Sequence, residues 1–344
     1  MTDKLLTIII PAYNAQKYLR TALDAFTAVP GRDRLDVIVV NDGSTDGTEQ
    51  LAREYCGRFP RTVRVLNKEN GGHGSAINAG AQAAEGKYVK VVDADDWIEP
   101  PRLEEFLGLL ETAEADIIAA NYHTVHMQTG HVADYVMEGV PYGGELPLEE
   151  FLKLGRGAWS CCTFHGLCYR AEFYRQSGCQ LPEKVFYEDQ EYATLPFFSA
   201  KSIMPVDLFL YEYLIGNQSQ SVSDENMAKR IGHQETVLLD TNRRYLAAEQ
   251  SLSRQRREYA LYKLSGMLLG YYATALLREP CRPKGREEAA GMRARMAAEN
   301  PPLERATRRG YGLFRALHAL RITNRRMEAV KASGAYRSLK KIIH

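Results

Sequence analysis

Hydrophobic residues in the first 120 positions fall into short continuous runs, each followed by a stretch with the periodicity of an amphipathic helix. Leu5–Ile10 is an aliphatic run that ends at Pro11, and the stretch 14–28 after it predicts a helix. The same pair of patterns recurs three times, and a fifth strand follows. The further strands are expected at 35–40, 63–66, 88–92 and 116–121, and the further helices at 44–56, 74–84 and 101–112. Apolar strands that alternate with helices are typical of an α/β fold with a mainly parallel sheet flanked by helices.

The alternation weakens after residue 121 and then changes character. Shorter aromatic-rich segments extend to about Tyr213, and the pattern from Glu225 onward is almost entirely helical. We expect helices at 226–250, 255–277 and 286–299, with a break by proline and glycine at Pro280–Gly285. The predicted organisation is a domain over 1–223, with halves 1–122 and 123–223, followed by an all-helical region over 224–344.

Charge is distributed unevenly along the 344 residues. The formal net charge is +1, but residues 301–344 hold eleven Lys and Arg against Glu304 and Glu328, a local charge of +9. This basic, partly apolar tail favours contact with an anionic surface rather than a nucleic acid wrapped by the whole fold. The tail could lie on an anionic bilayer, or it could be a solvated helix face that packs on the domain.

No segment has the sequence of a membrane-spanning helix. The longest largely apolar run without charge, Leu264–Leu277, has 14 residues, whereas a spanning helix needs about 20. The N-terminus leads directly into the first strand without a signal-peptide pattern. We therefore expect a cytoplasmic protein, with the basic tail as a possible contact to the inner face of the cell membrane.

Three carboxylates follow the fourth expected strand. Asp93, Asp95 and Asp96 lie within four residues, directly after Val91 and Val92. So much negative charge at the end of a buried strand is unfavourable unless a cation lies beside it. Mg²⁺ and Mn²⁺ prefer oxygen ligands, often one or two carboxylates together with phosphate oxygens. The segment therefore favours a divalent metal with a diphosphate over a solvated acidic loop that caps the next helix.

Two polar segments that contain glycine also follow expected strands. In 41–48, Asp42 can accept hydrogen bonds from a nucleotide base or ribose, whereas Ser44 can cap the helix. In Asn70–Asn78, backbone amides of the glycine-rich turn can contact a sugar or phosphate, and His73 either faces the ligand or has a structural role. This segment lacks the third glycine of G-x-G-x-x-G, so the dinucleotide-binding fingerprint is not satisfied.

Four motifs in order carry a resemblance to a known family. Thr7–Asn14, Val39–Asp46, Asn70–Asn78 and Val92–Trp97 resemble the motifs of family 2 glycosyltransferases with the GT-A fold. The resemblance implies a nucleotide-sugar donor held by 1–122, an acceptor side in 123–223, a divalent metal at the aspartates, and inversion at the anomeric carbon. Ile77 stands where many relatives have Arg. The chain also lacks the Q-x-x-R-W motif of processive synthases, which favours transfer of a single sugar.

The resemblance also implies roles for individual residues. By similarity Asp95 binds the metal, Mn²⁺ or Mg²⁺. The residues assigned to donor binding are Pro11, Tyr13, Asn14, Asp42, Ser44, Gly72, His73, Asp93 and Ala94.

Inverting transfer needs a general base that deprotonates the acceptor hydroxyl. The family usually places it in a Glu-Asp pair about 90 residues past the metal motif, where this chain has Glu188 and Asp189. We predict Asp189 as the base, with Glu188 as its neighbour or substitute; the alternative is a helix N-terminus with favourable acids. The segment 214–222 resembles a loop that closes over the diphosphate. The residues assigned to the acceptor side are Trp159, His165 and Asp96.

The sequence therefore predicts a metal-dependent inverting glycosyltransferase. Its expected partners are a nucleotide-sugar donor, most simply a UDP-sugar, and a glycan or lipid-linked acceptor in cell-surface polysaccharide or glycoconjugate synthesis. Two alternatives remain open. A nucleotidyltransferase would make a nucleotide-sugar from an NTP and release pyrophosphate, and a non-catalytic scaffold would bind a nucleotide-sugar without turnover.

Overall fold

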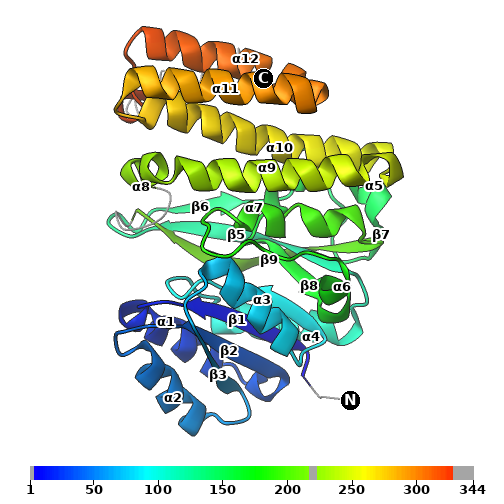
Figure 1. Ribbon diagram of the computed structural model, residues 1–344. Coiled ribbons are helices and arrows are strands. Elements are labelled where there is room, and N and C mark those ends of the chain that lie inside the picture. The colour runs from blue at the N-terminus through cyan, green and yellow to red at the C-terminus, as the bar shows by residue number, and fades with distance from the viewer. Residues whose placement is uncertain (1–3, 217–222, 328–344) are drawn as a thin grey trace. The chain divides into compact units, whose positions relative to one another are not determined.

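The computed structural model describes residues 4–216 and 223–327, and these pack as two compact units (Figure 1). The first unit comprises 4–216 together with Leu252–Arg256. The second comprises 223–251 and 257–327. Leu252–Arg256 pack with the first unit although they follow a helix of the second.

The first unit begins with four strand–helix pairs at the positions expected from the hydrophobic runs. The elements are β1 (Leu6–Ala12), α1 (Gln16–Thr27), β2 (Leu35–Asp42), α2 (Thr48–Arg58), β3 (Val63–Lys68), α3 (His73–Ala83), β4 (Tyr88–Val91) and α4 (Pro100–Thr112). Side chains in the middle of β1 and β2, including Ile8–Ile10 and Val37–Val40, are fully buried. Strands with such continuous burial are covered on both faces. Helix α1 packs with α2 and α4.

The second half of this unit is less regular. Its elements are β5 (Ile117–His126), β6 (Val132–Tyr135), β7 (Leu146–Pro147), α5 (Leu148–Lys153), β8 (Leu167–Arg170), α6 (Ala171–Gln176), α7 (Asp189–Tyr192) and β9 (Ser202–Ile215). Short 3₁₀ turns occur at Arg32–Arg34, Ala158–Cys161 and Leu195–Phe198. The aromatic-rich residues before Tyr213 belong to β9, a strand of 14 residues.

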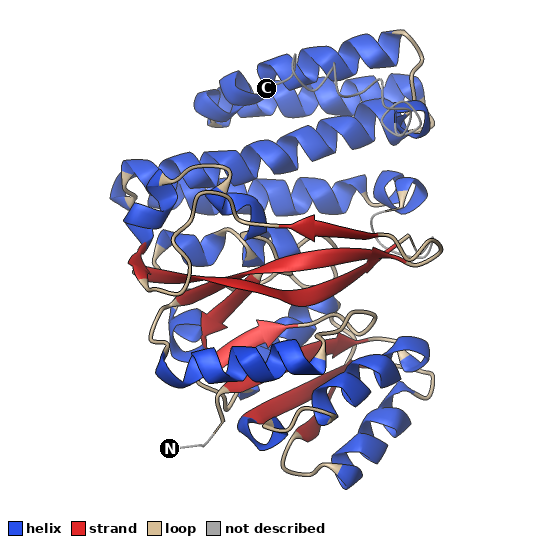
Figure 2. Ribbon diagram, turned by 180° about the vertical axis from the view of Figure 1, so that it is seen from behind, coloured by secondary structure: helices blue, strands red, loops and turns tan. Residues whose placement is uncertain are grey.

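Nine strands of the described residues form one sheet, in the order β3-β2-β1-β4-β8-β5-β9-β7, with β6 paired to β5. Figure 2 shows the strands in red with helices around them. The neighbours β3, β2, β1 and β4 run parallel, as do β5 and β9. Strand β8 pairs antiparallel with β4 and β5, and it joins the two parallel parts. The predicted fold class, a mainly parallel α/β sheet flanked by helices with a helical C-terminal region, is confirmed.

The second unit is helical. It contains α8 (Asp224–Lys229), α9 (Ile231–Ala248), a 3₁₀ turn (Glu249–Ser251), the part of α10 (Arg254–Ala273) from residue 257, a π-helical turn (Thr274–Arg278), α11 (Arg282–Glu299) and α12 (Pro301–Ala319). The break expected at Pro280–Gly285 is wrong in extent, because α11 begins at Arg282. Pro283 occupies the first turn, where its missing N–H costs nothing. Gly285 lies so close to the Ala275 carbonyl that no side chain would fit.

None of the helices in the described ranges combines the length and the hydropathy that a membrane crossing requires. The residues 217–222 of the expected loop over the diphosphate, and 328–344 of the basic tail, lie outside the described residues.

Candidate active site

The polar segments that follow the parallel strands meet at one edge of the sheet. Ala12 at the end of β1 pairs with Asn41, and Asp42 at the end of β2 pairs with Lys68. Helix α3 can pack close to β1 because Gly80 has no side chain. A Cβ at this position would lie only 2.5 Å from Ile9 Cγ2. Ligands of parallel sheets bind at this carboxyl edge.

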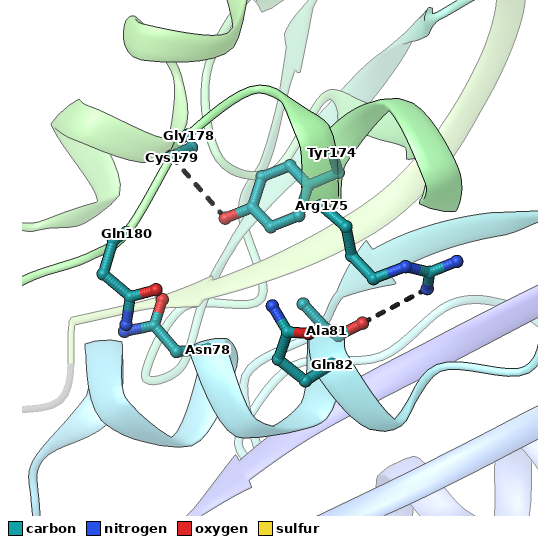
Figure 3. A pocket seen from close by; sticks show the side chains of 8 residues that line it. All are labelled: Asn78, Ala81, Gln82, Tyr174, Arg175, Gly178, Cys179 and Gln180. Atoms are coloured by element: carbon teal, nitrogen blue, oxygen red, sulfur yellow. Dashed lines mark hydrogen bonds between the residues drawn. The ribbon is translucent and has the colours of Figure 1, made fainter.

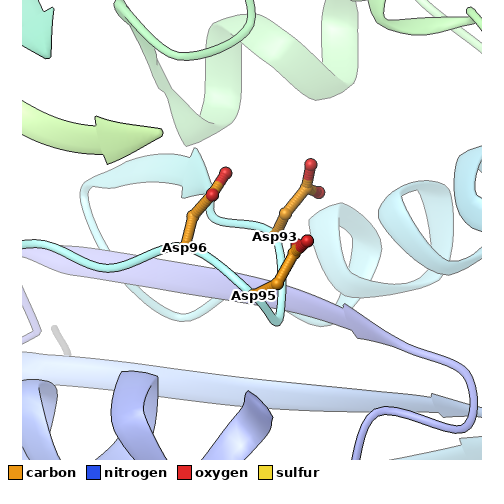
Figure 4. A group of neighbouring side chains, drawn as sticks. All are labelled: Asp93, Asp95 and Asp96. Carbon is orange, nitrogen blue, oxygen red and sulfur yellow. The ribbon is translucent and has the colours of Figure 1, made fainter. Parts of the chain in front are cut away.

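Asp93, Asp95 and Asp96 form a carboxylate cluster just beyond β4 (Figure 4). One oxygen from each lies within 4.8 Å of the others. Asp96 is buried, and its carboxylate accepts hydrogen bonds from the Tyr211 hydroxyl (2.6 Å) and the Leu214 amide (2.8 Å). Burial raises the pKa of Asp96 well above its usual value, and the charges of its two neighbours raise it further. An all-oxygen set under this repulsion fits Mg²⁺ or Mn²⁺.

The ring of His73 connects this cluster to the segment that carries the predicted base. Nε2 lies 2.8 Å from Asp93 Oδ1, and Nδ1 lies 2.6 Å from Glu188 Oε1. Burial alone would lower the pKa of His73, but the two carboxylates hold this pKa well above the ordinary value. Burial raises the pKa of Asp93, and the charge and hydrogen bond of His73 bring it below the ordinary value. The three groups therefore form a continuous chain of contacts across the site.

Asp42 is fastened to the glycine-rich turn. It is 2% exposed and accepts hydrogen bonds from Lys68 Nζ (2.7 Å) and from the backbone amides of Gly71 (2.9 Å) and Gly72 (2.8 Å). These partners place the predicted donor residues Asp42 and Gly72 in direct contact. Any hydrogen bond from a nucleotide to Asp42 would add to partners that it already has.

The remaining predicted donor residues lie near the end of β1 or β4. Ser44 Oγ accepts a hydrogen bond from the Asn14 amide (3.0 Å), and the Asn14 side chain accepts one from the Thr45 amide (2.8 Å). Tyr13 is 56% exposed, whereas Pro11 and Ala94 are buried. Tyr13 is thus an exposed aromatic side chain of this group that is available for stacking on a base.

The predicted base belongs to the same site. Glu188 is buried, while Asp189 begins α7 and is half-buried. Asp189 Oδ2 accepts a hydrogen bond from Gln190 Nε2 at 3.0 Å. Burial raises the pKa of the Tyr213 hydroxyl, and four carboxylates raise it further. These are the carboxylates of Asp96, Asp93, Asp189 and Asp95. Asp189 thus shares an acidic environment with the aspartate cluster, and its neighbour Glu188 is joined to Asp93 through His73.

On the expected acceptor side, His165 and Trp159 differ. The His165 ring stacks on Tyr213 with ring centroids 4.0 Å apart, next to the site. Trp159 is only 6% exposed on its 3₁₀ turn, so it has little surface to offer an acceptor.

Sequence reasoning missed Tyr211, Tyr213 and Lys90. The two tyrosines lie on β9, whose pairing with β5 is not visible in the sequence. Lys90 is fully buried, and its ammonium donates to the carbonyls of His165 (2.6 Å) and Leu167 (3.2 Å). A lysine inside the apolar run of β4 was a signal that could have revealed it.

A small open pocket of about 80 Å³ lies elsewhere on the first unit, between α3 and the segment that begins with α6 (Figure 3). Its lining contains no carboxylate. The residues that line it are Asn78, Ala81, Gln82, Tyr174, Arg175, Gly178, Cys179 and Gln180. It therefore offers no carboxylate ligand to a metal ion.

Comparison with known proteins identifies the family. The Glycosyl transferase family 2 model matches residues 7–175. EpsH of Bacillus subtilis (strain 168) is 30% identical over 263 residues, which cover 75% of this chain and 74% of EpsH. The chain belongs to glycosyltransferase family 2. It is therefore a glycosyltransferase, and the resemblance seen in the four sequence motifs is confirmed.

One further sequence relative and one solved structure are similar to this family 2 chain. Chondroitin synthase of Pasteurella multocida (strain Pm70) is 39% identical over 120 residues, which are 35% of this chain and 12% of the synthase. The crystal structure of S. aureus TarS 1-349 in complex with UDP-GlcNAc has a TM-score of 0.52 at 19% identity, and the match covers 89% of this chain and 92% of the TarS 1-349 chain. The likeness to TarS shows a shared fold, and the GT-A prediction is confirmed.

The buried imidazole of His165 generates a pH prediction. Burial lowers the pKa of His165 to about 4, so it takes up a proton near pH 4 when folded and near pH 6.5 when unfolded. The unfolded state therefore binds more protons between these values, and stability falls as the pH falls from about 6.5 to 4, by up to about 1.4 kcal/mol per unit.

His165→Phe removes this proton uptake. In urea denaturation between pH 4.5 and 7.5, we expect the wild type to lose stability relative to the variant as the solution becomes acidic. A difference in unfolding free energy that stays constant with pH would contradict a neutral, buried His165.

Proposed function

We propose that this chain is a metal-dependent inverting glycosyltransferase that moves one sugar from a UDP-sugar to a hydroxyl of a glycan or lipid-linked acceptor. The observation that carries the proposal is the link between the carboxylate cluster and the segment of Asp189. His73 contacts both Asp93 (2.8 Å) and Glu188 (2.6 Å), the residue that directly precedes Asp189. A metal–diphosphate site and a base for the acceptor are the two parts that inverting transfer requires.

Asp95 is the proposed metal ligand within the cluster, because by similarity it occupies the metal position of the family's aspartate motif and its carboxylate lies within 4.8 Å of those of Asp93 and Asp96. Asp93 pairs with His73, and Asp96 accepts from Tyr211 and Leu214. When bound, Mn²⁺ or Mg²⁺ supplies positive charge that stabilises the leaving diphosphate.

Asp189 is the proposed base, because Glu188 is buried against His73 whereas Asp189 is partly exposed. Its carboxylate would accept the proton of the acceptor hydroxyl. The acceptor oxygen then bonds to the anomeric carbon as the bond from that carbon to the diphosphate oxygen breaks, with inversion.

Similar proteins support a UDP-sugar as the donor and polysaccharide synthesis as the process. TarS, which shares the fold, was crystallised with UDP-GlcNAc, and chondroitin synthase by its name makes a polysaccharide. We extend these to a UDP-sugar donor and to cell-surface polysaccharide or glycoconjugate synthesis at the cytoplasmic side of the membrane.

We also propose that α12 contacts the anionic surface of that membrane. Exposed arginines on α12 include Arg305, Arg309 and Arg315, and Leu313 is exposed on the same helix. The single acid of the helix, Glu304, is buried and pairs with Arg293 and Arg308. A helix that exposes several arginines and a leucine, with its one acid buried, complements anionic lipid headgroups.

Metal-dependent nucleotide binding is the first test of the donor site. In a thermal-shift titration with UDP, GDP and dTDP, each with Mn²⁺ or with EDTA, UDP should stabilise the chain only with Mn²⁺. A nucleotide at 100 times its Kd adds about 2.7 kcal/mol, which raises Tm by several degrees. Asp95→Asn should abolish the shift, and Asp134→Asn on β6 is the control.

Other outcomes would favour the alternatives. Stabilisation by UTP together with pyrophosphate release would indicate a nucleotidyltransferase. Binding of UDP by a chain that turns over no UDP-sugar would indicate a scaffold, and the absence of any metal-dependent shift would contradict the donor site.

The base assignment predicts a separation of binding from turnover. Asp189→Asn should keep its affinity for UDP with Mn²⁺, because this carboxylate acts on the acceptor, and should lose about 10²- to 10⁴-fold in transfer rate. Radiolabelled transfer and calorimetry measure the two properties. If Asp189→Asn transfers normally and Glu188→Gln does not, Glu188 is the base.

The membrane contact predicts a charge-dependent affinity for vesicles. Replacing Arg305, Arg309 and Arg315 by Gln should weaken co-sedimentation with phosphatidylserine-containing vesicles by about 100-fold, since each surface cation contributes about 1 kcal/mol. The control replaces Arg53, Arg58 and Arg61, with the same change of charge. Equal weakening in both variants, or binding to RNA but not to vesicles, would contradict the proposal.

A further inference from the structure

The glycine-rich motif makes its contacts with a segment more than 100 residues away in the sequence. We call Gly71–Asn78 the clamp and Leu181–Asp189 the base segment. The Asn78 side chain bonds both backbone groups of Leu181, donating to its carbonyl (2.9 Å) and accepting from its amide (3.1 Å). The Lys184 amide donates to the Gly71 carbonyl at 2.7 Å. Two further side-chain contacts join Ser75 to Glu183 and His73 to Glu188.

The clamp can approach the base segment only because it contains glycine. A Cβ on Gly74 would lie 2.6 Å from the Pro182 carbonyl oxygen and 3.0 Å from Glu188 Cγ. A Cβ on Gly72, where φ is +87°, would lie 2.9 Å from the Lys184 amide nitrogen. Both obstacles include backbone atoms, so a methyl group at either position would displace the base segment.

The base segment needs stabilising contacts from outside itself, because its backbone is strained at two residues. Lys184 has a φ of 55° and Tyr187 a φ of 74°, and neither is glycine. Residues persist in this left-handed region when the surrounding structure over-determines them, and such residues cluster at functional sites. Tyr187 directly precedes Glu188 and Asp189, so the strained backbone at Tyr187 sets the direction in which these two acidic side chains point.

We propose that the clamp positions the catalytic base, with Asn78 and Gly74 as positioning residues that act through the base segment rather than on the substrate. This inference rests on the proposed function for the identity of Asp189 as the base. His73 completes the clamp, since its ring spans from Glu188 to Asp93 and fixes the base segment relative to the carboxylate cluster. The glycine-rich motif thus serves the acceptor half of the reaction as well as the donor half.

The test compares Asn78→Ala and Gly74→Ala with a matched control, Gly108→Ala. Gly108 is an exposed helical glycine on α4 of the same unit, and a Cβ there would meet nothing within 4 Å. Hydrogen–deuterium exchange of the full chain reports on the base segment without any substrate, because exchange follows local opening. Calorimetry with UDP and Mn²⁺ reports on the donor site, and UDP release from a panel of UDP-sugars reports on turnover.

We expect exchange at residues 181–189 to accelerate at least tenfold in Asn78→Ala and Gly74→Ala and not in Gly108→Ala. The Kd for UDP should stay within twofold, while kcat falls about 10- to 100-fold with KM for the donor unchanged, because a small misplacement of a reacting group has effects of this size. A merely structural role would instead change kcat, KM and the Kd together.

Unchanged exchange at 181–189 in both variants overturns the inference, as does faster exchange with an unchanged kcat. Failure of the proposed function has a different signature. In that case the wild type itself neither binds UDP with Mn²⁺ nor releases UDP, while the exchange data still decide whether the clamp holds the segment.

Discussion

Repulsion among three carboxylates is the constraint around which the first unit is organised. Asp93, Asp95 and Asp96 approach one another within 4.8 Å at the end of a buried strand, where water cannot fully screen them. Asp96 and Asp93 each have a protein partner that offsets part of this repulsion. Tyr211 donates to Asp96 from β9, and His73 faces Asp93 from α3. The loop after β4 is thereby tied to elements from both halves of the unit, and the excess negative charge that remains is what a divalent cation would offset.

The same ties account for the shape of the site. Strand β8 joins the parallel strands β3, β2, β1 and β4 to β5 and β9, and so brings Tyr211 of β9 into hydrogen-bond contact with Asp96. The glycine-rich turn lies between Asp42 and the base segment. Its backbone amides donate hydrogen bonds to Asp42, and its Gly71 carbonyl accepts one from the base segment. The residues proposed to bind the donor and the proposed base therefore depend on the same glycine-rich turn. A displacement of α3 and the turn before it would move both the amides that donate to Asp42 and the groups that contact the base segment.

The extent to which sequence predicted this structure follows from the range of the interactions. The first four strands and helices are set by local periodicity, and their predicted positions agree with the structure to within a few residues. The antiparallel insertion of β8 and the length of β9 depend on pairings between distant segments, which periodicity does not report. The aspartates were visible because three charges after an apolar run are anomalous. The contact of His73 with Glu188 spans 115 residues, so the sequence left the role of His73 open between ligand and structure.

The carboxylate cluster is proposed to hold a divalent metal together with a nucleoside diphosphate. Electron paramagnetic resonance of free Mn²⁺, titrated into the full chain with and without UDP, tests this proposal most directly, because it counts the bound ion without an acceptor or a known sugar. With UDP present, the chain should remove one further Mn²⁺ per chain from the free pool, beyond the Mn²⁺ that the same concentration of UDP binds alone, and Asp95→Asn should lose this uptake. A free Mn²⁺ signal equal to that of a matched sample of UDP and Mn²⁺ without the chain would contradict a metal–diphosphate site at the cluster.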